Sequence, residues 1–260
     1  MIKALFFDID GTLVSFKTHA IPTSTVEALH RAKDRGVKIF ISTGRPFSLI
    51  NNLSEIENLI DGYITTNGAY SFLGDKIVSL SPIAHKEVKR VIEFADMEGV
   101  SCMIVGEKDI VMHNPTAKAE DIFGKLLNVH GLRTDVFSHC AQSEAILQLT
   151  PVIDEEQQRR LQPLLKSVEI TRWCPDFADI TAKGVDKAKG LAEIARYCGF
   201  NPGDTMAFGD GGNDISIIRE AGIGVAMGNA NRSLIDIADY VTDSVDDDGI
   251  YNALIHFGII

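Results

Sequence analysis

The chain has 260 residues, of which 45% are hydrophobic and 23% charged, and this composition is typical of a globular protein with one large or two modest domains. Its formal net charge of −11 excludes a generally basic surface, so we expect no nucleic-acid partner. No apolar stretch could span a bilayer and the N-terminus has no signal-peptide pattern, so we expect no membrane partner and a cytoplasmic location.

The first 66 residues alternate between buried strands and amphipathic helices. In chain order, the pattern predicts a strand over 2–7, a helix between 23 and 36, a strand over 37–41, a helix over 46–56 and a strand over 63–66. Strands that alternate with helices in this way indicate a parallel sheet with helices on its faces, a Rossmann-like α/β fold.

The pattern changes after residue 70, where short strands and helices follow each other in a separate α+β arrangement. The predicted elements are a hairpin over 70–80, helices over 85–97, 117–129 and 154–165, and strands near 100–105, 110–113, 145–149, 168–173 and 177–181. This stretch is an α+β arrangement of its own.

The α/β rhythm returns near residue 187. It predicts helices over 187–198, 214–221 and 249–257, and strands over 205–208, 223–226 and 240–242. The simplest organisation is one α/β core, formed by residues 1–83 and 183–260, that is interrupted by an inserted α+β domain over residues 84–182.

Polar residues gather where the predicted core strands end or helices begin. Four clusters share this placement: Asp8-Ile9-Asp10-Gly11-Thr12, Ser42-Thr43-Gly44-Arg45, Lys187, and Gly209-Asp210-Gly211-Gly212-Asn213-Asp214. Ligands of open parallel sheets bind at the carboxyl ends of the strands, so we expect the four clusters to converge there.

Four carboxylates in these clusters, on Asp8, Asp10, Asp210 and Asp214, would crowd one small space. A hard cation with oxygen ligands relieves such repulsion, and Mg²⁺ suits this best because it uses a few carboxylates, keeps waters and readily takes a phosphate oxygen. A calcium loop is excluded, because Leu13 and His19 occupy the positions where its Gly and Glu belong.

The same residues identify a family resemblance. Asp8-Ile9-Asp10-Gly11-Thr12-Leu13-Val14 resembles the nucleophile motif of the haloacid dehalogenase (HAD) superfamily, and three further motifs follow in the family's order. These are Ser42-Thr43-Gly44-Arg45-Pro46, Gly184-Val185-Asp186-Lys187 and Gly209-Asp210-Gly211-Gly212-Asn213-Asp214. The insert between the second and third motifs is similar to that of the Cof-type branch, in which sugar-phosphate phosphatases occur.

The resemblance implies a role for each motif residue. It implies Asp8 as nucleophile and Asp10 as general acid and then base. It implies Mg²⁺ held by Asp8, Asp210 and the backbone carbonyl of Asp10, with Asp214 orienting a metal-bound water. Phosphoryl oxygens would be held by Thr43 and the Gly44 amide. Asn213 would help position the phosphoryl group or Asp210, and Lys187 would offset the charge of the phosphoryl oxygens.

Some assignments leave alternatives open. Lys183 and Lys189 lie near Lys187, which we favour because it alone follows the Gly-Val-Asp spacing. Arg45 would either contact substrate or be an exposed residue that opens a helix. We interpret the acids over 246–248 as residues that interact favourably with the N-terminus of the last helix.

In the Cof-type branch the inserted domain is a cap that selects the leaving group. Arg172, Trp173 and Asp176 are our candidates for cap residues facing the substrate, because an aromatic face and polar groups suit a sugar. The alternative is that Trp173 belongs to the core of the cap.

The leading hypothesis is therefore a Mg²⁺-dependent phosphatase that hydrolyses small phosphorylated metabolites, with hexose and related sugar phosphates the favoured class. A phosphotransferase or mutase, which passes phosphate from Asp8 to a second hydroxyl, is the enzymatic alternative. The alternative from another functional class is a regulatory protein without turnover, in which the phosphorylated aspartate acts as a switch.

Overall fold

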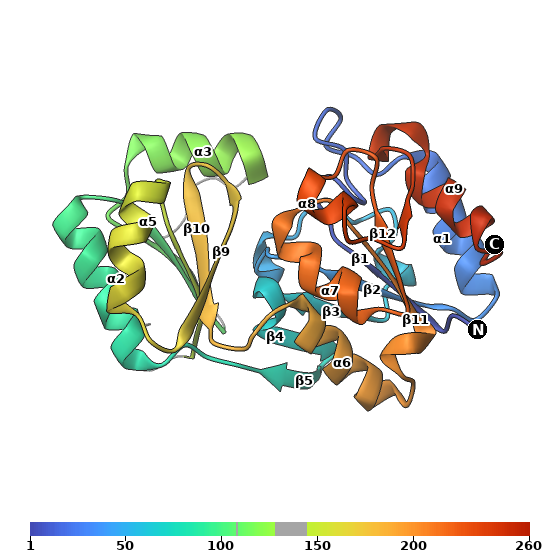
Figure 1. The fold of residues 1–260 in the computed structure, drawn as a ribbon, viewed down its shortest axis with the longest axis horizontal. Coiled ribbons are helices and arrows are strands. Elements are labelled where there is room, and N and C mark those ends of the chain that lie inside the picture. The colour runs from blue at the N-terminus through green and yellow to red at the C-terminus, as the bar shows by residue number, and fades with distance from the viewer. Residues whose placement is uncertain (108, 128–144) are drawn as a thin grey trace. The chain divides into compact units, whose positions relative to one another are not determined.

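The computed structural model describes residues 1–107, 109–127 and 145–260, without the side chains of residues 126, 127 and 173. The chain divides into two compact units: a core unit of Met1–Leu80 and Asp186–Ile260, and an inserted unit of Ser81–Val185 (Figure 1). The sequence places these boundaries near residues 83 and 183. Within the described residues, every helix is too short or too polar to cross a bilayer.

An eight-stranded sheet with the order β13-β12-β11-β1-β2-β3-β4-β5 forms the centre of the core unit. The strands from β13 to β3 are parallel, whereas β4 and β5 extend the sheet as antiparallel strands. Their bounds are β1 Ala4–Phe7, β2 Lys38–Ser42, β3 Gly62–Thr65, β4 Tyr70–Leu73, β5 Lys76–Leu80, β11 Thr205–Gly209, β12 Ile223–Ala226 and β13 Tyr240–Val241. The expected parallel core is therefore confirmed.

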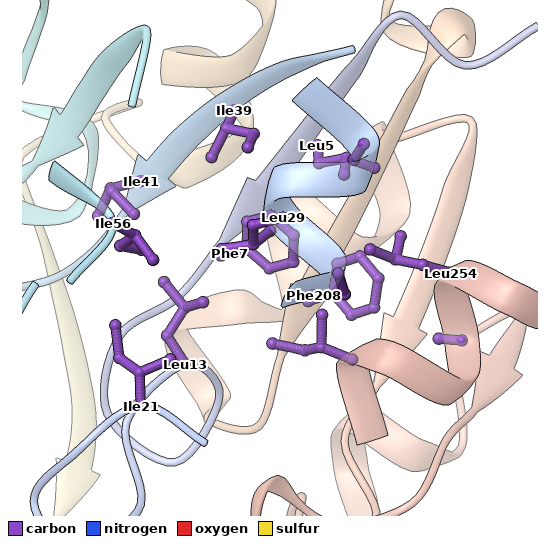
Figure 2. Packing of buried hydrophobic residues seen from close by; sticks show 14 of the residues in the cluster. Leu5, Phe7, Leu13, Ile21, Leu29, Ile39, Ile41, Ile56, Phe208 and Leu254 are labelled. Carbon is purple, nitrogen blue, oxygen red and sulfur yellow. The ribbon is translucent and has the colours of Figure 1, made fainter. Parts of the chain in front are cut away.

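Helices cover both faces of this sheet. On one face, α1 (Thr23–Asp34) and α9 (Gly249–His256) share a hydrophobic cluster with Leu5 and Phe7 of β1 (Figure 2). The opposite face carries α6 (Lys187–Cys198), α7 (Ile215–Glu220) and α8 (Arg232–Ile235), which pack in a second cluster with Ala4 and Phe6. Alternate residues of β1 thus face opposite layers, and this two-sided burial fixes the register of the strand that ends at the site.

The inserted unit has its own antiparallel sheet, with the order β7-β6-β8-β10-β9. Its strands are β6 Cys102–Gly106, β7 Ile110–His113, β8 Ile146–Pro151, β9 Val168–Cys174 and β10 Phe177–Ala182. The helices α2 (His85–Glu98) and α5 (Glu155–Leu161) share one hydrophobic cluster with this sheet, and α3 (Ala117–Leu127) contributes Phe123 against Phe177.

Two predicted helices differ from the structure. The segment 46–56 forms one short 3₁₀ turn over Phe47–Leu49 and a further turn over 54–56, because the polar residues Asn51 and Asn52 favour turns over helix continuation. The helix predicted over 154–165 ends at Leu161, where Pro163 follows in a 3₁₀ turn. The last two residues of the helix predicted over 117–129 lie outside the described residues.

Candidate active site

Three neighbouring strands deliver three of the polar clusters to one edge of the core sheet. Strand β1 is parallel to both β2 and β11, with Phe7 opposite Ile41 on one side and Phe208 on the other. The residues that follow these strand ends, Asp8, Thr43 and Asp210, therefore meet at the carboxyl edge.

Lys187, at the first position of α6, connects two of the acidic residues. Its side chain is fully buried, and its Nζ atom donates to Oδ1 of Asp8 at 2.7 Å and to Oδ1 of Asp214 at 2.5 Å. A cation at the start of a helix gains nothing from the helix dipole, so the two carboxylates account for its position. Of the three candidate lysines, Lys187 is the one that the structure brings to Asp8.

Asp214 is held on both of its oxygens. While Oδ1 accepts from Lys187, Oδ2 accepts the backbone N–H groups of Asp210 at 3.1 Å and Gly211 at 2.9 Å. Gly209 makes this approach possible, because a Cβ atom there would lie 2.5 Å from Cβ of Asp214. The loop after β11 is thus closed around the Asp214 carboxylate.

The crowding of acids changes their proton affinities. Burial is the main cause that raises the pKa of Asp8 to about 7, while Lys187 opposes the rise and Asp214 and Asp10 add to it. Burial, followed by the charges of Asp8 and Asp214, raises the pKa of Asp210 to about 8. Burial alone would lower the pKa of Lys187, but Asp214 and Asp8 outweigh it and the net change is upward.

Asp8, Asp210 and Asp214 form a group of carboxylates that could hold a metal ion. One ligand oxygen from each lies within 4.8 Å of the others. The buried ammonium group of Lys187 pairs with two of these carboxylates, those of Asp8 and Asp214. Among the described residues, no lysine or arginine pairs with the third, Asp210. A divalent cation with oxygen ligands would relieve this imbalance.

The side chain of Asp10 lies outside that group and is paired with Arg45. Nε and Nη2 of Arg45 each lie 2.7 Å from one carboxylate oxygen of Asp10, and Nη1 donates to the Leu49 carbonyl at 3.1 Å. The Arg45 side chain is only 6% exposed. The interpretation of Arg45 as an exposed residue that opens a helix is therefore wrong.

Thr43, Gly44 and Asn213 lie along the neighbouring loops. The Thr43 hydroxyl accepts the backbone N–H of Arg45 at 3.0 Å, and the Thr43 side chain is buried. A Cβ atom on Gly44 would lie 3.5 Å from Nδ2 of Asn213 and 3.1 Å from Oδ1 of Asn67. The loop after β2 and the loop after β11 thus meet at Gly44.

Two asparagines of this region were not predicted from the sequence. Asn67 follows β3, and its Oδ1 accepts Nδ2 of Asn213 at 3.1 Å. Asn229 donates to the Gly11 carbonyl at 2.8 Å and accepts the Val245 N–H at 2.9 Å. Asn67 had a usable signal, since Thr66-Asn67-Gly68 is a polar turn at a strand end like the four clusters; Asn229 had none.

The candidate cap residues Arg172, Trp173 and Asp176 differ in their surroundings. All three guanidinium nitrogens of Arg172 donate within that unit, to Gln158 and to the carbonyls of Ile153, Asp154, Cys174 and Pro175. Asp176 is 46% exposed in the turn between β9 and β10, and the side chain of Trp173 lies outside the described residues. The bonding of Arg172 supports a role in joining β9 to the start of α5.

The acids over 246–248 have separate side-chain partners. Asp246 accepts from Ser15 at 2.6 Å and pairs with Lys17, while Asp248 accepts from Ser24 at 2.5 Å. These contacts tie the segment before α9 to the loop after β1 and to the first turn of α1. Asp248 lies at the N-cap position of α9, as expected, but its side chain makes no capping hydrogen bond there.

Comparisons with known proteins identify the family of this chain. The family model of haloacid dehalogenase-like hydrolases matches residues 5–254. The 5-amino-6-(5-phospho-D-ribitylamino)uracil phosphatase YcsE of Bacillus subtilis is 31% identical, over 98% of this chain and 96% of that protein.

Two solved structures are similar over nearly the whole length. The HAD subclass IIB sugar phosphatase BT4131 is 52% identical with a TM-score of 0.95, over 99% of this chain and 100% of that one. The HAD phosphatase BT1666 of Bacteroides thetaiotaomicron is 38% identical with a TM-score of 0.89, over 100% and 96% of the two chains. The chain therefore belongs to the haloacid dehalogenase-like hydrolase family, as a phosphoric monoester hydrolase with a Cof-type insert.

Proposed function

We propose that this phosphatase hydrolyses monoesters of small phosphorylated metabolites, preferably hexose and related sugar phosphates, through an aspartyl-phosphate on Asp8 and with Mg²⁺. The observation that carries the proposal is the buried Lys187 ammonium between Asp8 and Asp214, beside an Asp210 carboxylate that lacks a cationic partner among the described residues. Such a site is short of positive charge until a metal ion enters, and the same ion would offset the negative charge of an incoming phosphate.

Asp8 is the proposed nucleophile. Its carboxylate attacks phosphorus, the bond from phosphorus to the leaving oxygen breaks, and the phosphoryl group is carried on the Asp8 side chain. An anion attacks another anion only if their repulsion is offset, and the ammonium group of Lys187, 2.7 Å from Asp8, supplies part of that offset. Phosphoryl transfer depends mainly on such positioning and charge stabilisation.

Asp8 and Asp210 are the proposed side-chain ligands of Mg²⁺, with the backbone carbonyl of Asp10. Asp214 has both oxygens engaged by Lys187 and two backbone N–H groups, which favours its assignment as an orienting residue at this site. When bound, Mg²⁺ would neutralise the carboxylates and polarise the phosphoryl oxygens.

Asp10 is the proposed general acid and base. It would give a proton to the leaving oxygen in the first step and take one from the attacking water in the second, which releases phosphate and restores Asp8. Arg45 binds both oxygens of Asp10 in this structure, so one oxygen would leave the pair to carry the transferred proton. General acid–base catalysis of this kind contributes roughly 10²–10⁴-fold.

The phosphoryl oxygens would be held by Thr43, the Gly44 amide, Asn213 and Lys187, all of which lie in the core unit. Selection of the leaving group by the inserted unit stays a prediction, as do the contributions of Arg172, Trp173 and Asp176. The preference for sugars is supported by the 52% identity to a protein described as a sugar phosphatase.

The test is a panel of initial rates with phosphorylated hexoses, pentoses, nucleotides and pyridoxal phosphate, measured with Mg²⁺ and with a chelator. We expect free phosphate from hexose phosphates at the highest kcat/KM, and loss of the rate with the chelator. Product analysis separates the transferase alternative, because stoichiometric transfer to a second sugar in place of phosphate release would reject hydrolysis. Equal rates with and without the chelator would reject the metal.

A further inference from the structure

The turn that follows β3 adopts a backbone conformation that its residues rarely take. Thr66, Asn67 and Gly68 have φ angles of +50°, +53° and +94°. Left-handed backbone is common for Gly and tolerated by Asn, but for a β-branched residue such as Thr66 it is a true outlier. Strain of this kind persists only where the surroundings hold it in place.

The loop after β2 holds this turn from one side. The N–H of Thr66 donates to the Arg45 carbonyl at 3.1 Å, and the N–H of Asn67 donates to the Thr43 carbonyl at 3.1 Å. The turn is therefore bonded to both neighbours of Gly44.

The segment before Lys187 holds the turn from the other side. A Cβ atom on Gly68 would lie 2.0 Å from the carbonyl oxygen of Asp186, so the backbones touch at a position that only glycine permits. Asp186 in turn caps α6, because its Oδ1 accepts the Lys189 N–H at 2.8 Å. The strained turn thus lies between the Thr43–Arg45 loop and the start of the helix that carries Lys187.

Because the turn is held on both sides, the position of the Asn67 side chain is determined. It is 3% exposed, its Oδ1 accepts Nδ2 of Asn213 at 3.1 Å, and its amide lies 3.1–3.2 Å from where a Cβ of Gly44 would be. Asn67 therefore borders the Gly44 backbone and bonds to Asn213.

We propose that Asn67 is a positioning residue for the phosphoryl-binding residues Gly44 and Asn213. Its side chain fixes the Asn213 amide and places a neutral group beside the Gly44 backbone. This inference rests on the proposed function, in which Gly44 and Asn213 hold phosphoryl oxygens. A neutral amide is required because a carboxylate at the same place would repel the incoming phosphate.

Two substitutions at position 67 separate the effect of the side chain from the effect of the backbone conformation. Asn67→Gly keeps the left-handed conformation and removes the amide, whereas Asn67→Asp keeps the shape and an acceptor for Asn213 but adds a negative charge. Asn114→Gly is the matched control, because Asn114 also has a positive φ of +49° but lies in the inserted unit.

The measurements are kcat and KM for the best sugar phosphate, the inhibition constant of inorganic phosphate, and a thermal melt of each variant. We expect Asn67→Gly to lower kcat/KM on the order of 10- to 100-fold, as misplacement of a binding group does, and Asn114→Gly to leave it unchanged. Asn67→Asp should raise KM and the phosphate inhibition constant more than Asn67→Gly does.

A double-mutant cycle with Asn213→Ala provides the decisive comparison. If Asn67 acts through Asn213, adding Asn67→Gly to Asn213→Ala should cause little further loss. Independent losses that multiply, or wild-type kcat/KM in Asn67→Gly, would overturn the proposal. Absence of phosphate release from the wild-type enzyme with Mg²⁺ would instead reject the proposed function, so the two failures are distinguishable.

Discussion

Arg45 clamps Asp10 through two parallel hydrogen bonds of 2.7 Å each, although the two residues lie 35 positions apart in the chain. The Arg45 side chain is 6% exposed and that of Asp10 17%. The planar guanidinium matches the two carboxylate oxygens, so the pair fixes the direction of the Asp10 side chain.

Arg45→Lys tests the importance of this direction. Lysine keeps the positive charge but cannot bind both oxygens in one plane, so we expect kcat/KM to fall on the order of 10²-fold while the protein stays folded. Steady-state kinetics with a hexose phosphate measure the change. Arg196→Lys is the control, because Arg196 is 77% exposed at the end of α6; equal activities of the two variants would contradict the clamp.

Lys187→Met tests the buried charge cluster. Removal of the ammonium leaves Asp8 and Asp214 without their shared cation, so we expect loss of activity and, in chelator, a free energy of unfolding lower by about 3–5 kcal/mol. Denaturant titration at neutral pH gives the value. Lys125→Met, at a lysine that is 75% exposed, should have little effect on either quantity; an unfolding energy of Lys187→Met near that of wild type would count against the cluster.

The raised pKa values predict how the metal-free protein responds to pH. Asp8 and Asp210 titrate near 3.8 when unfolded, but at about 7 and about 8 when folded, so the folded state binds more protons between these values. Their contribution to stability is complete below pH 4 and is lost as pH rises through 7 to 8. Melting temperatures in chelator should therefore fall over this range.

Asp210→Asn is the control for this pH dependence, because it removes one of the two titrating groups. The fall in melting temperature between pH 5 and pH 8 should be smaller in Asp210→Asn than in wild type. Added Mg²⁺ should stabilise wild type more at pH 8 than at pH 5, since it competes with protons for the same carboxylates. Identical pH profiles for the two proteins would rule out Asp210 as a titrating group.

Gly209→Ala tests the close approach of Asp214 to the end of β11. The added Cβ would lie 2.5 Å from Cβ and Cγ of Asp214, so we expect overpacking to cost about 1–3 kcal/mol and to displace the carboxylate from Lys187. Thermal unfolding and kcat/KM should both decline. At Gly203 an added Cβ meets no atom within 4 Å, so Gly203→Ala should behave as wild type; a Gly209→Ala enzyme with unchanged kinetics would argue against this packing.

The sequence predicted the fold and the meeting of three parts of the site for one physical reason. Buried strands are recognisable from their apolar runs, and polar residues that follow parallel strands must meet at one edge. This rule by itself is enough to bring Asp8, Thr43 and Asp210 together. Lys187 required the family motif, because the start of a helix does not by itself indicate what its side chain reaches.

Other features depend on contacts that no local pattern reveals. Arg45 follows a glycine in a polar turn and thus looks exposed, yet its partner Asp10 lies on a different loop. The strained φ angle of Thr66 is imposed by bonds to a separate segment. The bonds of Arg172 within the inserted unit likewise arise from tertiary packing. The residue types that suit a sugar were therefore a weak basis for predicting substrate contacts in that unit.

The most direct test of the account is to trap the phosphoenzyme. The wild-type enzyme is mixed with a labelled hexose phosphate and Mg²⁺, quenched in acid within one turnover, digested and analysed by mass spectrometry, with Asp8→Asn in parallel. We expect phosphate on the peptide that carries Asp8, and neither label nor turnover in Asp8→Asn. Turnover that persists in Asp8→Asn, or label bound to another residue, would contradict the central claim.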